Sequence, residues 1–165
     1  MSSILGSQQT PDADLLAAHW TTEFKPERIA CCVRQPAHYA TENEAETVLA
    51  TLLHVLAPLP RPSWCILLDA RATPGQVQEP AIEAVIVRYR KLLFEGFAGA
   101  AILTRTAAGT MQVWRQAKQD GVTYLVFSDE EAAYAYLRKR LGQKNTTVAR
   151  EQPLLKGRRR DSKVG

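Results

Sequence analysis

Residues 64–75 read WCILLDARATPG, an apolar segment that runs into an acid, a base, a hydroxyl and a turn. The apolar part is nearly continuous, which is typical of a strand covered on both faces of a sheet. In parallel sheets, ligands and switches usually lie just past the carboxyl ends of the strands. The stretch therefore predicts a central strand followed by a candidate functional loop.

Strand-like and helical patterns alternate on both sides of this segment. Upstream, HWTTEF and RIACCVRQ are two strand-like runs joined by Lys25-Pro26-Glu27, a connection of hairpin length. Downstream, GAAILT and VTYLVF are further strand-like runs. Apolar residues recur at helical spacing in three segments between them. These stripes are Ala45, Val48, Leu49, Leu52 and Leu56; then Ile82, Val85, Ile86, Tyr89 and Leu93; and then Thr110, Val113, Trp114 and Ala117, within a helix expected from Ala107 to Asp120.

A last helix is predicted from FSDEEAAYAYLRKR. Ser128 and Glu131 have the spacing of a capping box, in which each side chain satisfies a backbone N–H of the other residue. A phosphorylated serine in an acidic patch is the alternative interpretation of Ser128. The complete order, β-β-α-β-α-β-α-β-α, predicts an α/β fold with a single mixed sheet of four or five strands and about four helices.

The length of 165 residues and the 45% hydrophobic content suit one domain with tails. We expect a mobile amino-terminal segment over residues 1–16, an α/β domain over 17–141, and a basic, disordered tail over 142–165. No apolar run is long enough to cross a bilayer, and the amino terminus does not look like a secretory signal, so we expect a cytoplasmic protein.

Metal and cofactor chemistry are not indicated. Cys31, Cys32 and Cys65 are expected to be small buried residues, with the adjacent pair pointing to opposite faces of a strand. The cysteines and histidines lack metal-ligand spacing, and the motifs GxSxG, GxxxxGK[ST] and GxGxxG do not occur. We therefore expect no enzyme, no metal and no cofactor. The tryptophans at 20, 64 and 114 are expected in or beside the core.

The net charge of +4 conceals an asymmetry, because residues 138–165 carry +8 and residues 1–137 carry −4. A polar tail of this charge is a solubility tail or an electrostatic arm for an acidic protein, nucleic acid or an anionic membrane, whose binding would fall as salt rises. The tail cations singled out are Lys156, Arg158, Arg159, Arg160 and Lys163.

The order of elements, with the phrases WTTEF…RIACCVR, WCILLDARATPG and VFSDEEAAYAYL, resembles the STAS superfamily, and most closely its divergent SpoIIAA-like bacterial branch of anti-sigma factor antagonists. The resemblance covers roughly residues 20–141. It implies a STAS-like mixed sheet with helices mainly on one side, and a role in protein–protein regulation. Asp69 matches the acid that ends a strand before the phosphorylation switch of the family. The Asp-Ser-Ser/Thr-Gly motif does not follow here, since Thr73 is the nearest hydroxyl and precedes a proline.

The resemblance and the loop chemistry favour a non-enzymatic bacterial regulatory domain that binds a protein partner without the usual phospho-switch. The residues predicted to shape its docking loop are Asp69, Arg71, Thr73 and Gln76, with Asp69 and Arg71 anchoring the turn. One alternative is a module of the same fold that binds a small ligand or lipid. Another is nucleic acid or membrane association through the basic tail. Self-association into a homo-oligomer is compatible with all three.

Overall fold

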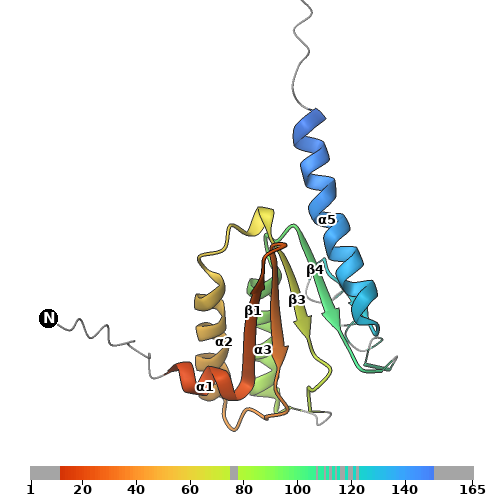
Figure 1. Ribbon diagram of the computed structural model, residues 1–165. Helices are drawn as coiled ribbons and strands as arrows, with labels where there is room; N and C mark the ends of the chain where they lie inside the picture. The colour runs from red at the N-terminus through yellow and green to blue at the C-terminus, as the bar shows by residue number, and fades with distance from the viewer. Residues whose placement is uncertain are drawn as a thin grey trace, which may run out of the picture.

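A five-stranded mixed sheet forms the centre of the computed structural model (Figure 1). The structure describes residues 12–74, 78–106 and 123–150, with side chains to residue 142, and isolated positions between 108 and 121. The strands lie side by side in chain order as β1 (Trp20–Lys25), β2 (Ile29–Arg34), β3 (Cys65–Asp69), β4 (Gly99–Leu103) and β5 (Leu125–Phe127). β1 is antiparallel to β2, and all other neighbours are parallel. The predicted mixed sheet, its opening hairpin and its central apolar strand are confirmed.

Helices cover both faces of the sheet. Helices α2 (Glu42–Leu56) and α3 (Pro80–Phe94) pack together on one face, and α5 (Glu130–Arg150) contacts β3, β4 and β5 on the other, as Figure 1 shows. A short helix, α1 (Asp12–His19), packs on α2 beside β1. A 3-10 turn, η1 (Arg61–Ser63), leads into β3. The prediction that the helices lie mainly on one side of the sheet therefore holds for α2 and α3 and has α5 as its exception.

The amphipathic pattern of α2 accounts for its position. Its five buried residues are those of the predicted stripe: Ala45, Val48, Leu49, Leu52 and Leu56. The helix begins after Thr41, whose Oγ1 accepts a hydrogen bond from the Glu44 backbone N–H at 3.1 Å. Such a cap satisfies one of the backbone donors that a helix leaves unpaired in its first turn.

Strand alternation separates two cores. Cys32 of β2 packs in the core under α2 and α3, whereas Cys31 packs in the core under α5, beside Cys65 of β3. All three cysteines are buried thiols, and this burial was predicted. In β3, Ile66 faces α2 and α3 while Leu67 faces α5, which explains why this strand is apolar at consecutive positions.

Both predicted domain boundaries need correction. Residues 12–16, which the sequence predicts to be mobile, belong to α1, where Leu16 is buried in the core. One helix of eight residues is too short to produce a sustained periodic pattern, so the sequence did not reveal it. At the other end, α5 continues through residues 142–150, which were assigned to the tail. Extending an existing helix costs far less than starting one, so α5 outlasts its apolar stripe, which ends at Leu141.

The cap of α5 also differs from the prediction. Asp129, not Ser128, precedes the helix, and its Oδ2 accepts a hydrogen bond from the Ala132 backbone N–H at 3.0 Å. The capping-box interpretation was therefore wrong by one residue. The helix predicted from Ala107 is described only in part: the described positions between 108 and 118 are helical, and Val113 packs against the α2 and α3 core. Thr110, Trp114 and Ala117 lie outside the described residues.

Candidate functional site

An ion pair between Asp69, the last residue of β3, and Arg71 holds the loop that follows this strand, residues 70–74. Arg71 donates from Nε to both carboxylate oxygens of Asp69, at 3.0 and 3.2 Å, and from a terminal nitrogen to Oδ2 at 2.7 Å. The Arg71 backbone N–H donates to the same carboxylate at 3.1 Å. Bidentate pairing of this kind is strong and directional. Asp69 and Arg71 thus anchor the turn, as predicted.

The same arginine links this loop to the helix on the far face. A second terminal nitrogen of Arg71 lies 3.3 Å from a carboxylate oxygen of Glu130, in the first turn of α5. Burial alone would raise the pKa of the Asp69 carboxyl, but the hydrogen bonds and charge of Arg71 outweigh it and leave that pKa below its ordinary value. The hydrogen bond to Asp69 is the main cause that raises the pKa of Arg71. Both groups are therefore held in their charged forms.

Thr73 does not occupy the position of a switch hydroxyl. It lies exposed in the turn, where its backbone N–H donates to the Ala70 carbonyl at 3.1 Å, and α3 begins only at Pro80. Gln76 lies outside the described residues, as do the tail cations Lys156, Arg158, Arg159, Arg160 and Lys163. The structure therefore describes three of the four predicted loop residues.

A pocket of about 730 Å³ opens beside this loop, at the carboxyl ends of the parallel strands and under α2 and α3. This volume is within the range of roughly 300–1,000 Å³ that is typical of small-molecule sites. Arg71, Thr73 and Pro74 of the loop form part of its wall. Its aliphatic lining comes from both layers: Leu68 and Ile102 from the sheet, and Leu49, Ile86, Leu93 and Val113 from helical segments.

The pocket wall is rich in arginine. Arg34 lies at the end of β2, Arg105 follows β4, and Arg90 projects from α3. Arg90 is buried and lies 3.7 Å from the carboxylate of Glu83, an acid that also lines the pocket. With Arg71, four guanidinium groups and one carboxylate of the described residues line the pocket. The charge of the described pocket wall is therefore mainly positive.

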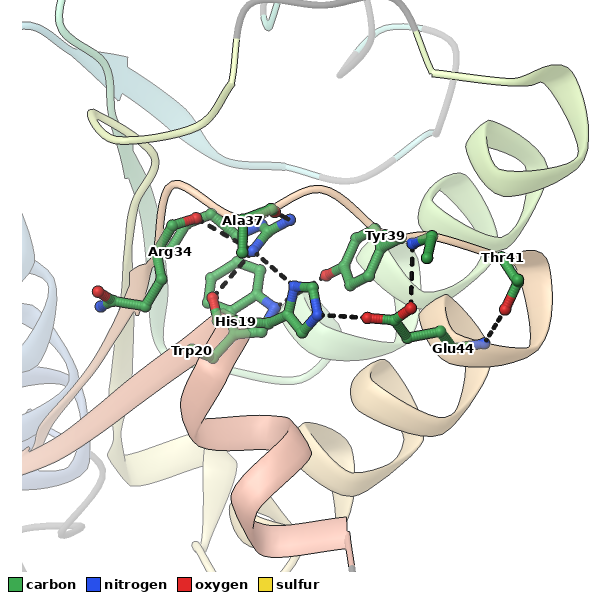
Figure 2. Close-up of polar contacts among 9 residues, drawn as sticks. His19, Trp20, Arg34, Ala37, Tyr39, Thr41 and Glu44 are labelled. Atoms are coloured by element: carbon green, nitrogen blue, oxygen red, sulfur yellow. Dashed lines mark hydrogen bonds and ion pairs between the residues drawn. The ribbon is translucent and has the colours of Figure 1, made fainter.

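Arg34 is the most deeply buried of these cations (Figure 2), with only 5% of its surface exposed. Its guanidinium donates to the backbone carbonyls of His19, at 3.0 Å, and Gln35, at 3.1 Å, and to that of Ala37. Its central carbon lies 4.5 Å from the centre of the Tyr39 ring, a cation–π contact. Burial lowers the pKa of Arg34, because a buried charge loses the stabilisation that water provides.

His19 connects Arg34 to the first turn of α2, as Figure 2 shows. Its Nδ1 lies 3.3 Å from an Arg34 nitrogen, and its Nε2 lies 2.7 Å from Oε1 of Glu44. Since the guanidinium offers only N–H donors, Nδ1 must be the acceptor and Nε2 must carry the proton that is donated to Glu44. The other oxygen of Glu44 accepts from the Ala40 backbone N–H at 3.0 Å. The network ties α1, β2 and α2 into one wall.

Two aromatic residues complete this wall. Trp20 Nε1–H donates to the Tyr39 hydroxyl at 3.0 Å, and the Tyr39 ring stacks on His19 with centroids 4.7 Å apart. Trp20 is buried in the core and Trp64 packs against its edge, as predicted, and Trp114 lies outside the described residues. Trp20 and Tyr39 both line the pocket.

One solved structure matches the chain with a TM-score of 0.54 and 14% sequence identity, and the match covers 72% of this chain and 91% of the other. It is a crystal structure of an uncharacterized protein from the DUF3478 family, with a SpoIIAA-like fold, from Shewanella loihica PV-4. The present chain has a SpoIIAA-like fold. No protein-family model matches it, and no curated protein matches it by sequence. The predicted resemblance is thereby confirmed at the level of fold.

Within the SpoIIAA-like fold, the Asp69 side chain points away from the pocket, although other residues of the same loop line it. Asp69 continues the alternation of β3 toward α5, whereas Leu68 and Ala70 face the pocket. Sequence reasoning found the loop but missed Arg34, His19 and Tyr39. Arg34 did leave one signal, since it is a charged residue that ends an apolar strand at the edge where ligands bind.

The described part of the chain contains neither a cluster of metal ligands nor a membrane-spanning helix. Within residues 12–142, apart from the gaps near 76 and 115, no group of three or more His, Cys, Asp or Glu side chains is placed to hold a metal ion. Among the helices of the described part of the chain, none is long and apolar enough to cross a membrane.

Proposed function

We propose that this protein is a non-enzymatic binding domain that holds a small molecule in the pocket under α2 and α3. The observation that carries this proposal is the pocket itself, which combines aliphatic walls with convergent cations at the carboxyl edge of a parallel sheet. The wall of His19, Arg34 and Glu44 is organised by internal hydrogen bonds and so needs no ligand to form it. A preformed wall reduces the entropy lost on binding.

Native mass spectrometry of the gently purified protein tests this function. We expect a stoichiometric adduct that is released on denaturation. Ile86→Trp adds volume to a side chain that lines the pocket, whereas Val87→Trp adds the same ring one residue later, at an exposed position on the same helix. The adduct should be lost from Ile86→Trp and kept by Val87→Trp, with both variants folded by circular dichroism. An adduct that both variants keep would contradict binding in this pocket.

A second candidate function is regulation through a protein partner that docks on the loop after β3. The observation that favours it is the clamp of Asp69, Arg71 and Glu130, which holds an exposed turn in one conformation at the edge of the sheet. A preorganised turn binds with a smaller loss of entropy than a mobile one. This candidate agrees with the regulatory role that the STAS resemblance implies, and it needs no phosphorylated hydroxyl.

Exposed alanines provide a matched test of docking. Ala72 lies in the turn, and Ala50 lies on the solvent side of α2. Affinity capture from the source cells with Ala72→Arg should lose a specific partner that the wild type and Ala50→Arg both retain. If all three proteins capture the same partner in equal amounts, docking does not involve this turn.

A further inference from the structure

The four arginines that line the pocket differ in how their charges are matched. Arg71 pairs with Asp69 and Glu130, and Arg90 lies near Glu83. For Arg34 and Arg105, no carboxylate of the described residues lies within 4.0 Å. Among the described residues, these two cations of the wall therefore form no ion pair.

Arg34 is the more informative of the two, because it is buried. Its hydrogen-bond partners are backbone carbonyls and a histidine ring, which are dipoles rather than opposite charges. The carboxylate of Glu44 is reached only through His19. Burying an ion without a counterion is costly, so an anion in the pocket beside Arg34 would stabilise this wall.

The aliphatic part of the lining favours a ligand that has an apolar part over a purely hydrophilic one. Aliphatic side chains face the pocket from the sheet and from the helices, and Leu68, Ile86 and Val113 keep part of their surface exposed. A small hydrated anion would leave these surfaces in contact with water, whereas a ligand with an aliphatic part would cover them and gain roughly 25 cal/mol per Å².

We infer that the pocket binds an acid with an aliphatic body, a carboxylate or a phosphate monoester, whose acid group faces Arg34 and Arg105. This inference rests on the proposed small-molecule function. Arg34 and Arg105 follow β2 and β4, which flank β3, so their backbones lie about two strand spacings, roughly 10 Å, apart at one edge of the sheet. One acid group above the end of β3 lies between them, and the aliphatic body extends toward Leu93.

Isothermal titration with three probes tests this inference on the full chain stripped of ligand. Decanoate carries both features, decanol lacks the charge, and acetate lacks the aliphatic body. We expect decanoate to bind at least about 10-fold more tightly than decanol, because hydrogen bonds to an ionised group are the stronger kind. Acetate should bind more weakly still. Decyl phosphate distinguishes the two acid groups, and the one that binds more tightly identifies the headgroup.

Arg105→Gln is the decisive variant, because its side chain is exposed and the buried network around Arg34 stays intact. It should weaken decanoate binding about 10-fold and leave decanol binding unchanged. Arg88→Gln is the matched control, since Arg88 is an exposed cation on α3 that pairs with Glu46 and does not line the pocket. It should change neither affinity.

The outcomes separate this inference from the proposed function. Decanol binding as tight as decanoate binding, with no effect of Arg105→Gln, would overturn the acid class while leaving a small-molecule pocket in place. Acetate binding as tight as decanoate binding would overturn the inference that the ligand has an aliphatic body. If no probe binds but native mass spectrometry shows a neutral adduct, the inference fails and the function stands. If no probe binds and no adduct is found, both fail.

Discussion

Asp69 illustrates how one side chain connects two layers of the molecule. It lies at the last position of β3, where the alternation of the strand turns it toward α5. Arg71 then bridges Asp69 to Glu130, so the loop and the helix are joined through a single guanidinium. Leu68, one residue earlier in β3, faces the opposite side of the sheet and lines the pocket. A difference of one residue along β3 therefore decides whether a side chain faces α5 or the pocket.

The depressed pKa of Asp69 predicts a dependence of stability on pH. In the unfolded chain an aspartate has a pKa of about 3.9, and in the folded protein the pKa of Asp69 is lower. The stabilisation is therefore fully present above about pH 5 and is lost as the pH falls through the folded value. Compared with Asp69→Asn, the wild type should lose its excess stability over this acidic window, as measured by urea unfolding. Glu131→Gln, at an exposed acid, is the control and should show little difference from the wild type.

At the scale of elements, α5 combines strong local signals with one tertiary constraint. Asp129 caps it, and Ala133, Leu137 and Leu141 form its buried stripe against β3 and β4. The close approach of the helix to the sheet depends on Gly99, the first residue of β4. A Cβ there would lie 3.0 Å from Arg140 Cβ and 3.1 Å from Cys65 Sγ. The sheet accepts this helix because one strand position has no side chain.

Gly99→Ala should therefore destabilise the protein by about 1–2 kcal/mol, because the added methyl group overpacks the interface between β4 and α5. Gly142→Ala is the control on the same helix, where a Cβ would meet nothing within 4 Å. It should be neutral or stabilising by up to about 1 kcal/mol, since alanine favours helix more than glycine does. Chemical denaturation measures the change in the free energy of unfolding for both variants. Equal effects of the two substitutions would contradict close packing at Gly99.

The cap of α5 offers a direct test of sequence against structure. Asp129→Ala should cost about 1 kcal/mol of stability, because the Ala132 backbone N–H loses its acceptor. Ser128→Ala should change stability by less than about 0.5 kcal/mol, as is usual for surface substitutions. The reverse order in thermal or urea unfolding would restore the capping box that the sequence suggested.

For the whole molecule, the distribution of charge predicts a role of the basic tail that is separate from the fold. The predicted role of the basic residues beyond 150 as an electrostatic arm stays a prediction. Removal of residues 151–165 leaves every element of the described domain in place. The truncated chain should lose affinity for anionic vesicles or DNA, by about 1 kcal/mol for each cation near an anionic membrane, and the affinity of the full chain should fall as salt rises. Binding that survives truncation would show that the tail has no role.

The sequence alone determined the α/β class, the mixed sheet and the faces of α2 and β3, because apolar periodicity and turn residues are local signals. It also determined the Asp69–Arg71 turn, whose partners are two residues apart. Only the tertiary structure revealed the pocket and its Arg34 wall, since His19, Arg34 and Glu44 come from three elements and meet through packing. Side chains that are distant in the chain have no common period. The loop could therefore be predicted from its amino-acid sequence, and the pocket beside it could not.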